Sequence, residues 1–227
     1  MSTKKTKKES GAIGFSSQYW EENYNEPEEM DGIVNAGQHA KYISAFFAVD
    51  YVDISSVIDL GFGLGHLFEE VLKEFMPYRA MGIEPSTYAF DRVKERKISP
   101  CDSTKLTLKK WDLVTWSESI HKKSKWYDLG LCTSVFQYLT DKELKKVIPM
   151  MSKQMKYLYL SVPTDYELQR QVSDLEFKDR YAIHRTKRDY LELLRPHFTI
   201  IGSRVLESKF HFNEETTHFT DYLYRRL

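Results

Sequence analysis

The sequence predicts an α/β fold: a doubly wound, seven-stranded, mostly parallel sheet with a C-terminal antiparallel hairpin. Two patterns lead to this prediction. Short apolar runs alternate with segments whose apolar residues recur every three or four positions, as strands alternate with helices in a parallel sheet. Near the C-terminus, only polar, turn-forming residues separate the last two apolar runs, which indicates an antiparallel pair. In open parallel sheets, ligands bind beyond the carboxyl ends of the strands.

Seven segments have the apolar character expected of strands. In chain order they are Val57–Leu60, Arg79–Ile83, a weak third strand that leads to Trp111–Leu113, Trp126–Cys132, Tyr157–Val162, Phe198–Leu206 and Phe219–Tyr224. Because Asn213–Thr216 is a polar connection, the last two segments form the expected hairpin.

Apolar residues at helical spacing predict helices between these strands. The predicted helices are Val34–Tyr51, Leu67–Phe75, Tyr88–Arg96, Asp141–Met155 and Arg188–Leu194. Such helices would cover both faces of the sheet, because crossover connections between parallel strands have one hand.

Composition excludes several classes of protein. The 227 residues suffice for one globular domain with a full core. The 33 basic and 33 acidic residues balance, which argues against a dedicated nucleic-acid binder, although a neutral total can contain a local basic patch. No apolar run is long enough to cross a bilayer, and we expect no membrane association. Two cysteines, Cys101 and Cys132, form neither a disulfide framework nor a zinc site, so we expect no metal and a cytoplasmic location.

We expect three regions along the chain. Residues 1–15 form a disordered basic tail, because its lysines have no apolar partners. Residues 16–53 form an N-terminal helical cap or lid, and residues 54–227 form the ligand-binding domain. In the cap, Tyr19, Trp20 and Tyr24 alternate with acidic residues, and their rings either dock on the domain or face the ligand as substrate-binding residues.

The stretch Asp59–Gly65 joins the first strand to its helix and has a glycine at every second position. Glycine permits positive φ and leaves no side chain between the backbone and a ligand. The helix that follows offers unpaired N–H groups. A dinucleotide-binding turn needs the spacing G-x-G-x-x-G. Here Gly65 comes one residue early and His66 takes its place, which disfavours a nicotinamide cofactor.

Glu84 ends the second strand, at the separation from the glycine turn at which an acid meets a ribose in nucleoside-binding sheets. A carboxylate accepts hydrogen bonds from two vicinal hydroxyls at once. The alternative is a solvated acid at a strand end. The glycine turn after the preceding strand favours the ribose role.

Together, D-L-G-F-G-L-G at Asp59–Gly65 and G-I-E-P-S at Gly82–Ser86 resemble the class I S-adenosylmethionine-dependent methyltransferases. The similarity extends to Trp111–Leu113 and to Tyr127–Leu139, which is similar to the fourth-strand motif of that family. That motif often ends in a histidine-leucine pair, and Tyr138 stands where the histidine is common. The resemblance covers residues 54–206.

The resemblance implies S-adenosylmethionine as the cofactor, methyl transfer as the reaction and residues 54–227 as the methyltransferase domain. Asp59 and the turn formed by Gly61, Phe62, Gly63 and Gly65 would face the methionine portion of the cofactor.

The same resemblance assigns the rest of the cofactor site. Glu84 would hold the ribose hydroxyls, and Pro85 would lie against the adenine. Asp112 would accept a hydrogen bond from the adenine amino group, with Leu113 packed nearby. Thr133 would border the sulfonium and the incoming acceptor.

Methyl transfer does not depend strongly on catalytic side chains. Aligning a nucleophile with the methyl carbon can supply about 7–11 kcal/mol of the barrier reduction, and a general base helps only when the nucleophile must lose a proton. The catalytic candidates are therefore weakly defined: His66, Tyr138 and His184, with His39 as a further histidine on the N-terminal helix.

The predicted acceptor is a small molecule. The motif of the DNA amino-methylating enzymes, Asn or Asp followed by two prolines and an aromatic residue, does not follow the fourth strand, where Cys132–Val135 stands. Asp165–His184 is either an acceptor-recognition element, which the family often has there, or a solvated helical excursion. Two other functions stay open: a non-catalytic, methyltransferase-like protein-binding module, and an RNA or protein methyltransferase that uses the lysine-rich tail.

Overall fold

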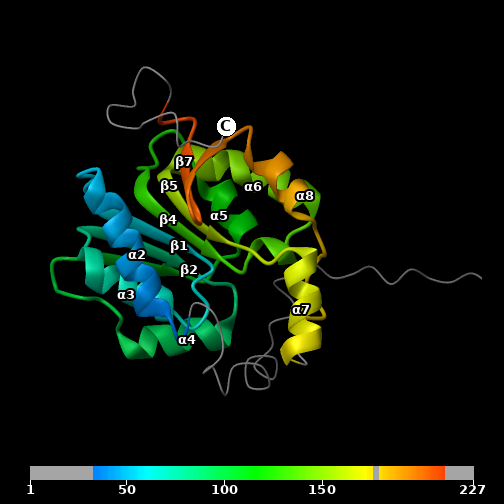
Figure 1. The fold of residues 1–227 in the computed structure, drawn as a ribbon. Coiled ribbons are helices and arrows are strands. Elements are labelled where there is room, and N and C mark those ends of the chain that lie inside the picture. The colour runs from blue at the N-terminus through cyan, green and yellow to red at the C-terminus, as the bar shows by residue number, and fades with distance from the viewer. Residues whose placement is uncertain (1–32, 176–178, 213–227) are drawn as a thin grey trace, which may run out of the picture.

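Seven strands form one sheet in the part of the chain that the structure describes, residues 33–175 and 179–212 of a computed structural model (Figure 1). They are β1 (Ser56–Leu60), β2 (Arg79–Ile83), β3 (Lys105–Lys109), β4 (Tyr127–Thr133), β5 (Met155–Ser161), β6 (Phe198–Gly202) and β7 (Val205–Ser208). Their spatial order is β3-β2-β1-β4-β5-β7-β6. β1 to β5 are parallel, and β7 runs antiparallel to both β5 and β6. The predicted sheet, with its C-terminal antiparallel hairpin, is confirmed.

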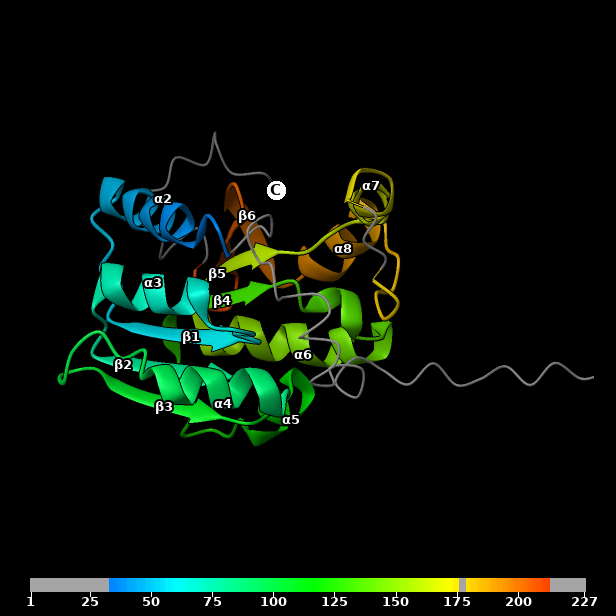
Figure 2. The ribbon, with the colours of Figure 1, turned by 90° about the horizontal axis from the view of Figure 1, so that it is seen from below.

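Helices cover both faces of this sheet (Figure 2). α2 (Ala36–Val49), α3 (His66–Phe75) and α4 (Thr87–Arg96) share one apolar cluster with the first face. α5 (Leu113–Ser119), α6 (Asp141–Gln154) and α8 (Lys187–Leu194) share a second cluster with the opposite face. α7 (Asp165–Leu175) follows β5 and lies beyond the carboxyl ends of the strands. No described helix has the length and apolar character that crossing a membrane requires.

The alternation of side chains in β1 explains why the sheet needs both layers. All five residues of β1 are buried. Val57 faces the cluster of α2 and α3, whereas Ile58 and Leu60 face the cluster of α5 and α6. Successive side chains of a strand point to opposite faces, so a central strand of a doubly covered sheet is apolar throughout. Burying one apolar side chain of this size stabilises the folded state by about 1.5–3 kcal/mol.

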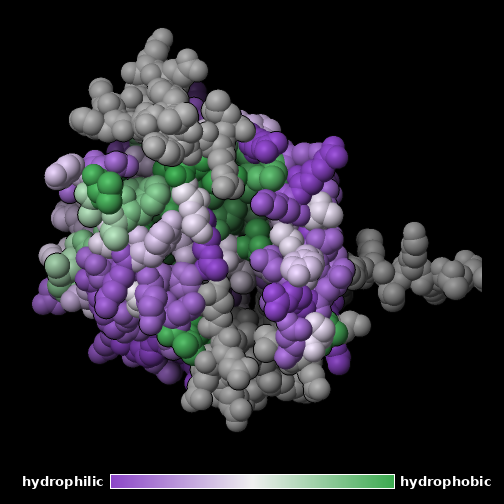
Figure 3. Space-filling view, viewed as in Figure 1, coloured by the Kyte–Doolittle hydropathy of each residue, from purple (hydrophilic) through white to green (hydrophobic). Residues whose placement is uncertain are grey.

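Surface hydropathy follows the same layering. Figure 3 shows hydrophilic surface over α3 and α4 on one side and over α7 on the other, with hydrophobic residues gathered in the middle of this face. The helices near the surface are amphipathic. In α6, the buried positions Leu144, Val147, Ile148 and Met151 recur at helical spacing, as expected from the sequence.

One strand prediction is wrong, and the reason is local. Residues 198–206 are not a single strand, because a turn at Ser203–Arg204 divides them into β6 and β7. Arg204 has φ of 62°, a left-handed conformation that no strand adopts. The two halves pair with each other and form the hairpin. The predicted strand Phe219–Tyr224 lies outside the described residues.

One helix was not predicted. α5 follows β3, and its cap, Asp112, is in the segment that the weak third strand was expected to reach. α7 occupies the first half of the polar stretch from Asp165 to His184, for which a solvated helix was one of the two alternatives.

Gly82 of β2 lies against the ring of Phe62, a residue of the glycine turn. A Cβ on Gly82 would lie 2.8 Å from Phe62 Cδ1, 2.8 Å from Phe68 Cε1 and 3.0 Å from Leu108 Cδ2. These three side chains enclose the position, and two of them are rigid rings. Any side chain at residue 82 must therefore displace the ring of Phe62, which belongs to the turn after β1.

We expect Gly82→Ala to lower the free energy of unfolding by about 1–3 kcal/mol, because the added methyl group overpacks a closed site. Gly37→Ala is the control, because an added Cβ on this residue of α2 would lie 3.5 Å from Oε2 of Glu70, which is an ordinary contact. Urea denaturation should show no comparable loss for Gly37→Ala. A loss in Gly82→Ala no larger than in Gly37→Ala would show that the rings around Gly82 are mobile.

Candidate functional site

The turn after β1 adopts a backbone conformation that favours glycine at three positions. φ is 104° at Gly61, 53° at Gly63 and 75° at Gly65. A Cβ on Gly61 would lie 2.5 Å from Cγ2 of Val135, and one on Gly65 would lie 2.7 Å from Cγ2 of Val93. Both conformation and space therefore require glycine at these two positions. The turn fits closely between the segment after β4 and helix α4.

Backbone hydrogen bonds attach this turn to the end of β2. The N–H groups of Gly61 and Phe62 both donate to the carbonyl oxygen of Ile83, at 2.9 and 3.2 Å. The N–H of Gly65 donates to the carbonyl of Phe62 at 2.7 Å and closes the turn before α3. The Phe62 ring is buried against Phe68 and Phe90, with ring centroids 6.2 Å apart in each pair. Phe62 thus presents its backbone to the carboxyl edge and its side chain to the core.

Glu84 lies one residue past β2 and is 4% exposed. Its Oε2 accepts a hydrogen bond from Gly63 N at 2.9 Å, and its Oε1 accepts one from Ser86 N at 2.9 Å. Burial raises the pKa of Glu84 to about 7, against the lowering effect of these two hydrogen bonds. Each carboxylate oxygen keeps a second lone pair, so the group can accept two more hydrogen bonds.

Asp59 is 3% exposed, and its Oδ1 has no hydrogen-bond partner among the described residues. Burial raises the pKa of Asp59 well above its ordinary value, and the negative charge of Glu84 raises it further. A buried carboxylate oxygen without a donor is costly, by about 1–3 kcal/mol. The fold therefore holds two acids side by side at the glycine turn, one of them with unsatisfied acceptor capacity.

The remaining predicted cofactor residues follow neighbouring strands. Pro85 and Ser86 lead from Glu84 into α4, where Ser86 Oγ caps the helix by accepting from Ala89 N at 3.4 Å. Asp112 follows β3 and caps α5, with Oδ1 2.7 Å from Thr115 N. Leu113 is buried in the cluster of that helix.

Thr133 ends β4 and pairs with Ser161 at the end of β5. The structure therefore brings residues after four parallel strands, β1 to β4, to one edge of the sheet.

The catalytic candidates are more scattered. His66 opens α3 directly after the turn, and its pKa is lowered by burial and by the nearby charge of Arg96. The Tyr138 hydroxyl lies 2.6 Å from Oδ2 of Asp179, so it holds the chain beyond α7. His184 is exposed. Tyr19, Trp20 and Tyr24, the predicted substrate-binding residues, lie outside the described residues.

A buried arginine that the sequence did not single out positions the segment after β4. Arg185 is 5% exposed and forms an ion pair with Asp141 at 2.8 Å. It also donates to the carbonyl oxygens of Phe136 and Leu139, at 3.2 and 2.6 Å. Arginine has five N–H donors in a planar fork, which suits several acceptors at once. Arg185 thereby fixes the short 3-10 helix Phe136–Tyr138 at the carboxyl edge.

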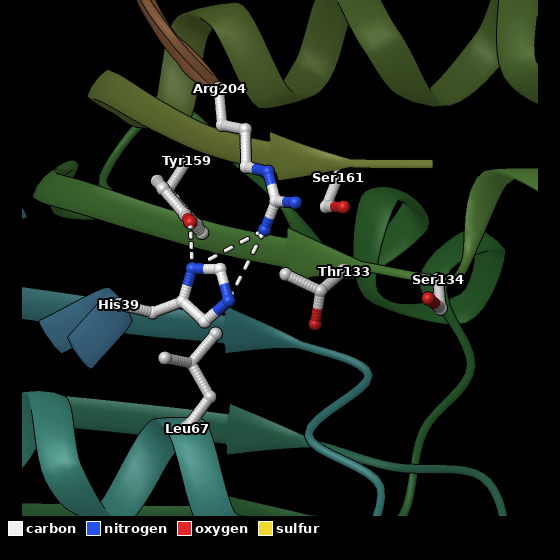
Figure 4. A pocket seen from close by; sticks show the side chains of 7 residues that line it. All are labelled: His39, Leu67, Thr133, Ser134, Tyr159, Ser161 and Arg204. Atoms are coloured by element: carbon white, nitrogen blue, oxygen red, sulfur yellow. Dashed lines mark hydrogen bonds between the residues drawn. The ribbon is translucent and has the colours of Figure 1, made fainter. Parts of the chain in front are cut away.

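A pocket opens at the carboxyl ends of β4 and β5, next to Thr133 (Figure 4). His39 of α2, Tyr159 and Ser161 of β5 and Arg204 of the β6–β7 turn line it. The pocket is small and partly open to solvent. Tyr159, Ser161 and Arg204 had no sequence signal, because three separate segments meet only in the folded chain. No cluster of His, Cys, Asp and Glu side chains suited to a metal ion occurs in residues 33–175 and 179–212.

No protein-family model matches the chain, and no curated protein matches its sequence. Solved structures match its fold. The plantazolicin methyltransferase BpumL in complex with S-adenosylhomocysteine (SAH) aligns with a TM-score of 0.63 and 13% identity, over 82% of this chain and 71% of its own. A S-adenosylmethionine-dependent methyltransferase from Clostridium acetobutylicum ATCC 824 gives 0.57 and 13%, over 78% and 84%. The chain has the class I methyltransferase fold. Magnesium protoporphyrin IX methyltransferase (ChlM) from Synechocystis PCC 6803, with bound SAH, gives 0.52 and 18%, over 77% and 83%.

The raised pKa of Glu84 predicts how stability depends on pH. Since the folded-state pKa is raised from 4.5 to about 7, the folded protein holds this proton more tightly than the unfolded chain does. The stabilisation is present below pH 4.5 and is lost as the pH rises through about 7. Over this pH range we expect the free energy of unfolding of wild type to fall by about 3 kcal/mol relative to that of Glu84→Gln. Denaturant titrations at several pH values measure both free energies. If the two proteins show the same pH dependence, Glu84 is not a buried ionisable group.

Proposed function

We propose that this protein is a S-adenosylmethionine-dependent methyltransferase that acts on a small-molecule acceptor. One observation carries the proposal. A buried glutamate at the end of β2 is hydrogen-bonded to the glycine turn at the end of β1, in a sheet of the methyltransferase fold. The three compared structures are methyltransferases, and two of them contain SAH, the product of the cofactor. These facts support the proposal through fold and chemistry rather than through sequence identity.

The residues at the carboxyl edge fit this cofactor chemically. The Oδ1 atom of Asp59 is buried without a donor, and an ammonium group such as that of methionine would supply one. The turn leads directly into α3, whose first N–H groups have no partner within the helix and could bind a ligand at the turn. Glu84 has two lone pairs left for two vicinal hydroxyls, as a ribose presents.

The other predicted cofactor residues lie at the carboxyl ends of the neighbouring strands, along the same edge of the sheet. Pro85 would pack against the adenine, and Asp112 would accept from its amino group with the oxygen that does not cap α5. Leu113, beside Asp112, would add an apolar wall. Thr133, at the end of β4, would border the methyl group and the acceptor.

The bound cofactor supplies an electrophilic methyl group, so the chain mainly orients and shields the reactants. The glycine turn and Glu84 hold one reactant against a rigid sheet edge. Arg185 fixes the 3-10 helix after β4, which would lie on the acceptor side of the bound cofactor. Alignment of this kind accounts for much of the rate of transfer reactions. His66, beside the turn, is half-buried with a lowered pKa, so it is neutral at physiological pH and able to accept a proton.

We further propose a small acceptor and a cytoplasmic location. The balanced charge of the whole chain supports a small acceptor over nucleic acid. Two of the compared enzymes are named for plantazolicin and magnesium protoporphyrin IX, neither of which is a nucleic acid. The free thiols of Cys101 and Cys132 suit a reducing compartment.

We expect Glu84→Ala to weaken SAH binding at least about ten-fold, because two charge-assisted hydrogen bonds to the ribose are lost. Isothermal titration calorimetry of SAH into wild type and variant measures the ratio. Glu192→Ala is the matched control, since Glu192 is an exposed acid on α8, far along the chain from the site.

Circular dichroism spectra of the three proteins check that each is folded. Affinity for SAH that is equal in wild type and Glu84→Ala would remove the ribose assignment. A wild-type protein that binds neither S-adenosylmethionine nor SAH would instead favour a methyltransferase-like binding module.

A further inference from the structure

The amino ends of the parallel strands form a second edge of the sheet, opposite the proposed cofactor site. The arrows of β1, β4 and β5 in Figure 2 point toward α7, so their other ends mark this amino edge. The loop before β4, the end of α6 and the residues after β7 meet there, because β7 runs antiparallel to β5. Strands of five to seven residues, at about 3.3 Å per residue, place the two edges roughly 20 Å apart.

Lysines gather on the amino edge from β4 to β7. Lys125 comes before β4, Lys153 near the end of α6 and Lys209 directly after β7, and all three are exposed. Lys156 of β5 lies among them, with its side chain 33% exposed. Within residues 33–175 and 179–212, the three exposed lysines form no ion pair. Their charges are therefore available to a ligand.

Aromatic rings lie between these lysines and connect them. Nζ of Lys156 lies 4.4 Å from the ring centroid of Trp126, which in turn lies 5.6 Å from that of His211. The ring of Phe210 lies 5.1 Å from the same imidazole, and the carbonyl oxygen of Lys153 is 3.1 Å from its Nε2. These contacts join one continuous surface, the lysine–aromatic patch: Lys125, Trp126, Lys153, Lys156, Lys209, Phe210 and His211.

The acids near the lysine–aromatic patch do not neutralise it. Asp128 and Glu207 are buried, at 6% and 4% exposed, and Oδ1 of Asp128 lies 3.3 Å from Nζ of Lys156. Glu118 is paired with a lysine of α6. Asp53 is exposed but precedes β1, so it limits the patch on that side. The surface from β4 to β7 therefore presents positive charge.

Two rings of the patch are exposed, which is unusual for large apolar side chains. Trp126 is 44% exposed and Phe210 is 62% exposed. Cations beside exposed rings are the combination that binds single-stranded nucleic acid, because the cations contact phosphates while the rings stack on bases. An acidic peptide would use the lysines and leave the rings idle. The imidazole of His211 separates the two rings, so the patch has no continuous apolar face to insert into a bilayer.

We propose that the lysine–aromatic patch binds single-stranded RNA, with phosphates at Lys125, Lys153 and Lys209 and bases on Trp126 and Phe210. Stacking needs unpaired bases, which RNA presents in loops and single-stranded segments. β4, β5 and β7 are neighbours about 4.8 Å apart, so the patch spans about 10 Å, enough for about three phosphates.

This RNA is a second ligand and not the methyl acceptor, because the patch lies on the edge opposite the residues proposed for the cofactor. The inference therefore goes beyond the proposed methyl transfer and does not depend on it. The balanced charge of the whole chain is compatible with such a site, since the lysines are concentrated at one edge.

The salt dependence of RNA binding tests the lysines. A fluorescent, unstructured RNA of about 12 nucleotides is titrated with the full chain, and anisotropy gives Kd at several salt concentrations. We expect Kd below about 100 μM at about 0.1 M salt. The triple variant Lys125→Gln/Lys153→Gln/Lys209→Gln should bind at least about ten-fold more weakly. Its slope of log affinity against log salt should be smaller by about 2, since each phosphate contact on a single strand contributes about 0.7.

A second triple variant, Lys41→Gln/Lys94→Gln/Lys187→Gln, is the matched control. It removes the same charge from exposed positions of α2, α4 and α8 and should keep both the affinity and the slope. Both variants retain the lysine-rich N-terminal residues, so these cannot cause a difference between them. Absence of RNA binding by wild type, or equal losses in the two triple variants, overturns the proposal.

An aromatic variant and competing polyanions test the choice of RNA. Phe210→Ala should weaken RNA binding at least about five-fold through lost stacking, whereas Tyr166→Ala, which removes a 66% exposed ring from α7, should not. A glutamate peptide of the same length and vesicles containing phosphatidylserine should each bind at least about ten-fold more weakly than the RNA. Unchanged affinity in Phe210→Ala, or tighter binding of the peptide or the vesicles, overturns the assignment.

Circular dichroism checks that every variant is folded, and calorimetry measures its affinity for SAH. We expect the patch variants to bind SAH as wild type does, because the two edges are separate. Loss of SAH affinity in the lysine variant would contradict that separation. If wild type binds RNA as expected but not SAH, the methyltransferase proposal fails and the RNA site stands.

Discussion

The carboxylate of Glu84 connects the ends of the neighbouring strands β1 and β2 at the point where a ligand would bind. It joins the end of β2 to Gly63 in the turn after β1 and to Ser86 at the start of α4. Burial makes this acid costly to ionise, as its raised pKa shows. The fold tolerates such a group because two backbone N–H groups, of Gly63 and Ser86, donate to it. The same arrangement leaves acceptor capacity that only an added ligand would use, so stability is given up where binding is gained.

The two halves of the carboxyl edge differ in their polar groups. Asp59 and Glu84 place acceptor atoms at β1 and β2, and burial raises the pKa of both acids. Arg204 and His39 collect donors on the α2 side of β4 and β5. The strand order places the two groups on either side of the boundary between β1 and β4, which are neighbours near the centre of the sheet. The net charge of the chain could not reveal this arrangement, because acidic and basic residues balance in the total.

Much of the fold was predictable because local patterns determine it. The apolar run of β1, the three glycines and the helical spacing of α6 each depend on residues close in sequence. The expected antiparallel hairpin is present, but its strands are β6 and β7, which the sequence predicted as one strand. The left-handed residue that divides them is Arg204, a residue type without turn preference. The Arg204–His39–Tyr159 contacts join residues up to 165 positions apart. Single-sequence patterns carry no signal of such contacts, so the pocket beside Thr133 could be found only in the folded chain.

The central claim is that the Glu84 carboxylate and the glycine turn together bind the nucleoside of the cofactor. A crystal structure of the protein with SAH tests this most directly. The account predicts both ribose hydroxyls within hydrogen-bond distance of the Glu84 oxygens, and the amino group of SAH beside Oδ1 of Asp59. SAH bound at another place, or bound at the turn with Glu84 contacting no hydroxyl, would contradict it.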